Sequence, residues 1–141
     1  MAKFNQAGFP ENGIPLLITQ TLTHDEMEDQ TRMIYKFLEH KRIDKLIFTL
    51  GFGAPSADMY RPRNIKLENL ARVIKENISQ GKFRLGDDDL YIKDENKDLR
   101  FILCHESDVH FTSINISILE EVESIWKSMK FQVKKAHIIN D

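Results

Sequence analysis

The sequence predicts an α+β fold, a single domain in which about three helices pack on a mixed, mostly antiparallel sheet. The chain has 141 residues, 41% hydrophobic and 30% charged, which suits one packed core and is too short for two ordinary domains. Three segments have the apolar spacing of amphipathic helices. After Gly81 the pattern changes to apolar alternation, so helices and strands do not alternate regularly along the chain.

The chain is expected to open with an irregular segment over residues 1–13, followed by a short strand over residues 15–20. Thr23 and Glu26 then have the spacing of a capping box, in which each residue satisfies a backbone amide of the other. Acidic residues crowd the next turns and basic residues follow up to residue 42, which complements the helix dipole at both ends. These signals predict the first helix.

Residues 45–51 form an apolar run closed by glycine, and we expect them to form a central strand buried on both faces. Residues 52–64 contain one glycine and two prolines, which favours a long loop. From residue 65 apolar side chains recur at helical spacing, and Gly81 supplies a left-handed C-terminal residue. A second helix is therefore predicted between these points.

Alternating apolar residues over 83–85, 90–94 and 99–103 predict a small antiparallel meander, with a hairpin turn at residues 94–98. A third helix is predicted over residues 117–129, with Ser117 and Glu120 at capping-box spacing. Residues 131–139 could return as a last strand at a sheet edge, where lysines discourage pairing with other molecules.

The single cysteine, Cys104, excludes an internal disulfide and favours a reducing, cytoplasmic location. It lies in an apolar run, where burial would raise its pKa and make it a poor nucleophile. The chain contains no motif for covalent catalysis and no segment of signal-peptide or membrane-spanning length. We therefore expect no catalytic residue and no membrane partner.

Residues 104–111 hold the densest group of reactive side chains. If a strand continued through them, Glu106, Asp108 and His110 would share one face. Residues four positions apart on a strand are about 13 Å apart, too far for one metal ion bound about 2 Å from each donor. Three interpretations stay open: a metal or acid/base centre completed by distant groups, a recognition surface, or a solvated strand end.

The loop at 52–64 contains Tyr60 and Arg61, which combine an aromatic ring with a guanidinium group suited to stacking and to carboxylate or phosphate contacts. A solvated loop explains the same residues. Gly51 and Gly53 do not make a dinucleotide-binding turn, because a third glycine is missing at the required spacing.

Charge is distributed unevenly along the chain. Residues 86–123 contain eleven acidic and three basic residues, a net charge of −8, whereas the whole chain carries only −2. The remainder therefore carries +6, and the folded domain could present one strongly acidic face. The acids either solubilise turns and a helix start or hold a cationic partner. The low overall charge argues against broad binding to nucleic acid.

A small, mildly acidic domain with helices against an antiparallel meander, without catalytic motifs and with an acidic segment at residues 104–111, resembles the immunity proteins of bacterial polymorphic-toxin and contact-dependent inhibition systems. The resemblance implies a protein that binds one cognate toxin domain, often a basic nuclease, and blocks its active site or its access to substrate. In this leading interpretation the partner-binding residues are Asp87, Asp88, Asp89, Asp94, Glu95, Glu106, Asp108 and His110, with Tyr60 and Arg61 as anchors.

Two other functions stay open. One is a small metal-assisted hydrolase in which His105, Glu106, Asp108 and His110 supply ligands or a base. The other is a regulatory domain whose basic remainder touches nucleic acid through residues such as Arg61, Arg63, Lys134 and Lys135. The leading interpretation requires no cofactor, no metal and no direct contact with nucleic acid.

Overall fold

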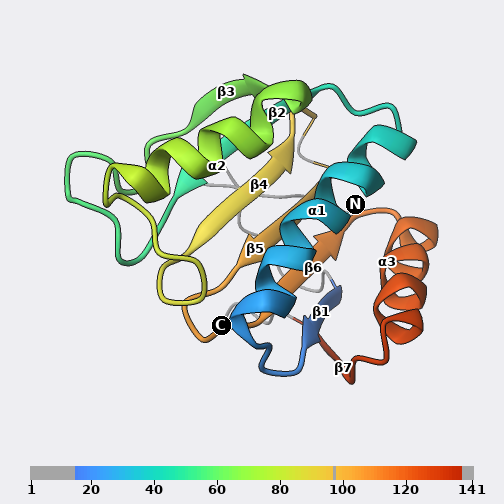
Figure 1. Ribbon diagram of the computed structural model, residues 1–141. Coiled ribbons are helices and arrows are strands. Elements are labelled where there is room, and N and C mark those ends of the chain that lie inside the picture. The colour runs from blue at the N-terminus through green and yellow to red at the C-terminus, as the bar shows by residue number, and fades with distance from the viewer. Residues whose placement is uncertain (1–14, 97, 138–141) are drawn as a thin grey trace.

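The computed structural model describes residues 15–96 and 98–137 and has an α+β architecture (Figure 1). The expected irregular segment at residues 1–13 and the last two residues of the strand expected at 131–139 lie outside the described residues. The elements are β1 (Pro15–Thr19), α1 (His24–His40), β2 (Lys45–Leu50), β3 (Arg63–Lys66), a 3₁₀ turn (Leu67–Asn69), α2 (Leu70–Ser79), β4 (Leu90–Asp94), β5 (Leu99–Leu103), β6 (Val109–Ser113), α3 (Ile116–Ser128) and β7 (Val133–His137).

Within the described residues, seven strands form one sheet in the order β3-β2-β4-β5-β6-β1-β7, and each neighbouring pair is antiparallel. The three helices of this part of the chain lie together on one face of the sheet (Figure 1). The predicted fold class and the three predicted helices are confirmed. No helix of the described residues is long and apolar enough to cross a bilayer.

Helix α1 begins at the capping box that the sequence predicts. The Glu26 N–H donates to the Thr23 hydroxyl at 3.1 Å, and the Thr23 N–H donates to the Glu26 carboxylate at 2.9 Å. Met27, Ile34 and Leu38 follow at helical spacing and are completely buried. Burial of each such side chain stabilises the fold by about 1.5–3 kcal/mol, so the apolar stripe holds α1 on the sheet.

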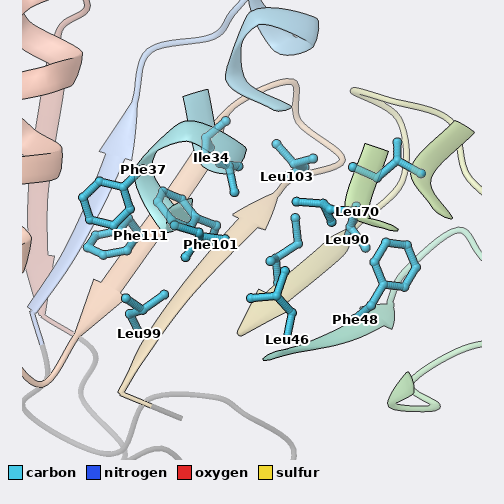
Figure 2. Close-up of a cluster of buried hydrophobic side chains, with 14 of the residues drawn as sticks. Ile34, Phe37, Leu46, Phe48, Leu70, Leu90, Leu99, Phe101, Leu103 and Phe111 are labelled. Atoms are coloured by element: carbon cyan, nitrogen blue, oxygen red, sulfur yellow. The ribbon is translucent and has the colours of Figure 1, made fainter. Parts of the chain in front are cut away.

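Three phenylalanines join α1 to the middle of the sheet (Figure 2). Phe101 of β5 and Phe111 of β6 are cross-strand partners whose ring centroids lie 4.5 Å apart. The ring of Phe37 on α1 meets both of them edge-on, at 5.9 and 6.3 Å. Aromatic pairs in this geometry add about 0.5–1.5 kcal/mol beyond their area burial.

Helix α3 begins two residues earlier than predicted. Its N-cap is Asn115, whose side-chain oxygen accepts hydrogen bonds from the N–H groups of Ser117 and Ile118, so Ser117 is not the capping residue. The helix is anchored by the buried Trp126, whose indole N–H donates to the Gln30 side-chain oxygen of α1 at 2.8 Å.

Strand β3 corrects the loop and helix boundary predicted near residue 65. Ile65 pairs with Leu46 of β2, and α2 begins only at Leu70. Pairing with a partner about twenty residues away decides this conformation, and local spacing cannot reveal it. Because β3 lies outside β2, the strand predicted to be central is second from the edge, and β5 occupies the middle.

The predicted meander is also corrected at two points. Residues 83–85 form no strand and make one isolated bridge, between Leu85 and Asp88. Strands β4 and β5 are buried along their whole length instead of alternating with solvent, so Lys93 and Arg100 are 3% and 2% exposed. The hairpin between β4 and β5 is confirmed.

Candidate functional site

Many of the predicted site residues lie where several connections meet at one end of the sheet. We call this region the loop end and define it as residues 20–26, 51–62, 80–89, 104–108 and 129–132. Antiparallel pairing places the last residue of β2 beside the first residue of β4, and the last residue of β5 beside the first residue of β6. Segments far apart in the sequence therefore become neighbours.

Backbone hydrogen bonds hold the segments of the loop end together. The Gly51 N–H donates to the Asp89 carbonyl at 2.8 Å, and the Asp89 N–H donates to the Phe52 carbonyl at 2.9 Å. The Leu22 N–H donates to the Ser107 carbonyl at 2.7 Å. These bonds restrict the backbone, so side chains on the loops are presented from fixed positions.

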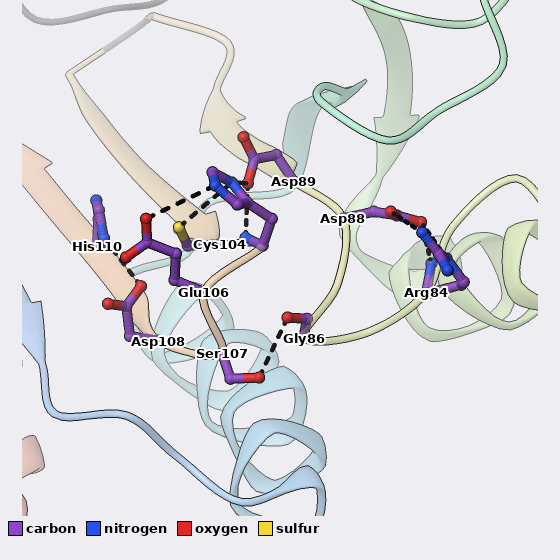
Figure 3. Close-up of polar contacts among 10 residues, drawn as sticks. Arg84, Gly86, Asp88, Asp89, Cys104, Glu106, Ser107, Asp108 and His110 are labelled. Atoms are coloured by element: carbon purple, nitrogen blue, oxygen red, sulfur yellow. Dashed lines mark hydrogen bonds and ion pairs between the residues drawn. The ribbon is translucent and has the colours of Figure 1, made fainter.

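Residues 104–108 form a tight turn between β5 and β6, which corrects the continued strand considered from the sequence. The Cys104 N–H donates to the Asp108 carbonyl at 2.9 Å, and the Ser107 N–H donates to the Cys104 carbonyl at 3.1 Å. Ser107 has a φ of 56°, the left-handed conformation that such three-residue hairpin loops require. Its hydroxyl donates to the Gly86 carbonyl at 3.1 Å, which offsets part of the strain (Figure 3). Cys104 and Asp108 thus face each other across the hairpin.

Asp88 is turned into the loop end. It is 2% exposed, and its carboxylate accepts hydrogen bonds from the Arg84 backbone N–H at 2.8 Å and from the Arg84 guanidinium at 3.1 Å (Figure 3). Hydrogen bonding and charge from Asp88 raise the pKa of Arg84. Gly53 packs so closely that an added Cβ would lie 2.0 Å from the Asp88 Oδ1 atom. The carboxylate is therefore used in internal structure and adds little to the exposed surface.

Asp89 holds His105 in place. One carboxylate oxygen accepts the His105 backbone N–H at 2.7 Å and lies 2.8 Å from the ring Nδ1 (Figure 3). The hydrogen bond to Asp89 raises the pKa of His105. The Phe52 ring lies over the imidazole with a centroid distance of 4.8 Å. Asp89, immediately before β4, thereby fixes the imidazole at the surface, and the Phe52 ring packs against that imidazole.

Asp108 and His110 form a second Asp–His pair on the other side of Cys104. The Asp108 Oδ1 and His110 Nε2 atoms are 3.0 Å apart (Figure 3). Burial alone would raise the pKa of Asp108, but hydrogen bonding and charge from His110, joined by Cys104 and His105, together outweigh burial and lower the pKa. Burial also raises the pKa of the Cys104 thiol to about 12, as the apolar run predicts. The thiol is therefore protonated at neutral pH.

Asp94 and Glu95 lie at the opposite end of β4, about 17 Å away along a five-residue strand. Asp94 is 5% exposed, and its carboxylate accepts the N–H groups of Asp98 and Leu99 at 2.7 and 3.0 Å. Glu95 is exposed. The structure thus divides the acidic segment between two ends of the sheet and does not bring these two residues to the loop end.

The exposed part of the loop end combines acids with aromatic rings. Asp87 and Glu106 are exposed, and so are Arg61 and Tyr60 in the long loop. Sequence reasoning did not assign a role to Phe52, which is 55% exposed next to His105. A phenylalanine between two glycines directly after a buried strand is a signal that could have identified it. The loop end contains eight acidic and four basic residues, a net charge of −4 with neutral histidines.

Two kinds of chemistry are available at this end of the sheet. The exposed rings and carboxylates suit contact with a cationic protein surface. Below them, thiol, imidazole and carboxylate groups around Cys104 have ligand atoms within 4.8 Å of one another.

Comparison of the chain with protein-family models, with curated proteins and with solved structures found no match.

Proposed function

We propose that this chain is a protein-binding inhibitor that docks its loop end on a basic partner domain, in the manner of an immunity protein that neutralises a toxin. One observation carries the proposal. Phe52 and Tyr60 are 55% and 51% exposed on loops that internal hydrogen bonds hold in place. Large aromatic side chains presented from a rigid frame supply much of the binding energy at protein interfaces.

Charge supports a basic partner. The loop end has a net charge of −4. Asp87 and Glu106 are exposed, and they flank Asp89 and His105, whose hydrogen bond holds this part of the surface in place. A nuclease domain presents cationic groups that bind phosphates, and carboxylates can occupy the same positions. Such an inhibitor would act in the cytoplasm, where the toxin reaches its substrate.

The first experiment compares capture of the partner by three tagged proteins. Wild type, the double variant Phe52→Ala/Tyr60→Ala and the control Ile116→Ala are incubated with lysate of the source organism. Ile116 is 67% exposed at the start of α3, after the end of β6 that lies away from the loop end. Loss of two interface aromatics is expected to cost at least about 2 kcal/mol, or roughly thirtyfold in Kd.

The proposal is supported if wild type and Ile116→Ala retain the same basic protein in equal amounts and the double variant does not retain it. In addition, one equivalent of the chain must stop the enzymatic activity of the purified partner. Equal capture by the double variant would remove the loop end as the docking surface. Capture without inhibition would contradict the inhibitor function.

Association kinetics then test the role of charge. The variant Asp87→Asn/Glu106→Gln removes two exposed charges and leaves Asp88 and Asp89 in their internal contacts. Association with the partner at low salt should slow severalfold, with little change in the dissociation rate, because steering acts on encounter. Glu95→Gln, at the far end of β4, is the matched control. An association rate that is insensitive to both salt and the double change would refute the electrostatic part.

A further inference from the structure

The turn at residues 104–108 brings together donors that the sequence keeps apart. Asp108 immediately precedes β6, and its Oδ1 atom lies 3.0 Å from the His110 Nε2 atom, so the two side chains point the same way. The hairpin places Cys104 opposite Asp108. One ligand atom from each of these three residues lies within 4.8 Å of the others. In a continued strand the donors would spread over about 13 Å, whereas the hairpin folds the chain back and brings them together.

We propose that Cys104, Asp108 and His110 form a binding site for a divalent transition metal of the zinc type. This metal site lies at the same end of the sheet as the proposed docking surface, but metal binding does not depend on partner binding. Three protein ligands leave a fourth position for water. Asp108 and His110, but not the buried Cys104, line a cavity of about 500 Å³ together with Glu106 and Lys134. This cavity gives an ion a route to the Asp108–His110 side of the site.

The distances suit a tetrahedral ion. Zinc bound at about 2.3 Å from sulfur and about 2.0–2.2 Å from nitrogen and oxygen separates its donors by roughly 3.3–3.7 Å. Asp108 and His110 are already 3.0 Å apart. Small rotations of the Cys104, Asp108 and His110 side chains would therefore place all three donors, and the backbone of the turn can stay unchanged.

The donor types select the class of metal. A thiolate, an imidazole and a carboxylate together favour Zn²⁺ or Co²⁺ over Mg²⁺ and Ca²⁺, which prefer oxygen-only ligands. On binding, the Cys104 sulfur forms a bond to the ion and its proton passes to solvent. The His110 nitrogen exchanges its contact with Asp108 for one with the ion, so both side chains become ligands.

A second set of donors, Asp89, Cys104 and His105, satisfies the same distance limit. The Cys104 sulfur lies 3.9 Å from the His105 Nδ1 atom. However, one Asp89 oxygen already accepts both the backbone N–H and the ring nitrogen of His105, and these bonds brace the turn. An ion there would break that brace, whereas an ion at Asp108 and His110 would not. We therefore assign the site to the latter pair.

The test is a titration of the full chain with Co²⁺ and then with Zn²⁺. Before the titration, any bound metal is removed with a chelator, and the chelator is then removed. We expect one Co²⁺ per chain, a thiolate-to-cobalt charge-transfer absorption, displacement of that absorption by Zn²⁺, and a higher Tm with metal bound. Absence of the charge-transfer absorption in the wild-type chain would overturn the site regardless of how any variant folds.

Four variants assign the ligands. Cys104→Ser should abolish the charge-transfer absorption, and His110→Gln should weaken Co²⁺ binding at least about a hundredfold, with circular dichroism confirming that each is folded. His105→Gln should bind within about tenfold of wild type. His24→Ala is the control for surface chelation, because His24, Asp25 and Glu28 form an exposed donor group on α1. Strong loss in His105→Gln with retention in His110→Gln would refute the assignment, and so would loss in His24→Ala.

Discussion

Replacing Asp94 by alanine and by asparagine separates its role as a hydrogen-bond acceptor from its charge. Its carboxylate closes the β4–β5 hairpin by accepting the N–H groups of Asp98 and Leu99. Alanine removes this acceptor and leaves the buried Leu99 N–H without it. Asparagine keeps a side-chain oxygen at the same position and removes the buried charge.

The expected magnitudes differ for the two changes. A hydrogen bond to a charged acceptor contributes about 1.5–3 kcal/mol, and a buried donor left unsatisfied costs about 1–3 kcal/mol. Asp98 is half-buried, so water partly replaces the lost acceptor at its N–H. Asp94→Ala should therefore lower the free energy of unfolding by about 3 kcal/mol at pH 7, whereas Asp94→Asn should stay within about 1 kcal/mol of wild type.

The pH dependence has a definite sign. Burial raises the pKa of Asp94 above the value of about 3.9 that applies to the unfolded chain. The folded protein thus holds this proton more tightly, and the resulting stability is complete below about pH 4 and is lost as pH rises through the raised pKa. Asparagine does not titrate. When the pH rises from 4 to 7, wild type should therefore lose stability that Asp94→Asn does not lose. The free energy of unfolding of the variant should rise relative to that of wild type.

Urea denaturation at pH 4 and pH 7 measures both effects, with the fluorescence of Trp126, the only tryptophan, as the signal. The comparison between variant and wild type removes the titration of other groups that both proteins share. If asparagine destabilises the protein as much as alanine at pH 7, Asp94 does not act chiefly as an acceptor. If raising the pH disfavours Asp94→Asn relative to wild type, the pKa of Asp94 is not raised in the folded protein.

Other contacts give shorter tests by urea denaturation, here followed by circular dichroism because one of the variants removes Trp126, the fluorescent signal. Trp126→Phe leaves the buried Gln30 oxygen without its donor and should cost about 3 kcal/mol, while adding Gln30→Leu should restore part of the loss; no restoration would contradict a hydrogen-bond origin. Asn115→Ala removes the cap of α3 and should cost about 1 kcal/mol, and no measurable change would argue against the cap. Ser107→Ala loses the bond to Gly86 and keeps the left-handed strain, whereas Ser107→Gly relieves the strain. Glycine should therefore be the more stable variant by about 1 kcal/mol, and the reverse order would contradict the φ of 56°.

The helices were predictable because their signals are local. The Thr23–Glu26 capping box lies within one helical turn, and Gly81 marks the end of α2 with a φ of 72°. Neighbours three or four positions apart in the sequence are also neighbours on a helix, so a short window contains the whole pattern. The α+β class followed from the same information.

The strands were only partly predictable because their partners are distant in sequence. The four residues of β3 resembled a loop, since the hydrogen bonds that make them a strand come from β2. Likewise, the turn at Cys104 and Asp108 carries no Gly or Asn-Gly signal, and a left-handed Ser107 replaces it. Only the paired structure distinguishes such a turn from a continuing strand.

For the candidate site, the sequence by itself determined which charges and donors the chain carries and that they concentrate in its later half. The tertiary structure decided their use. It turned Asp88 and Asp89 inward as acceptors for Arg84 and His105, left Phe52 exposed, and sent Asp94 to the other end of the sheet. The reason is physical: a carboxylate stays at the surface only where no buried or backbone donor offers it a better position, and the fold alone decides where those donors lie.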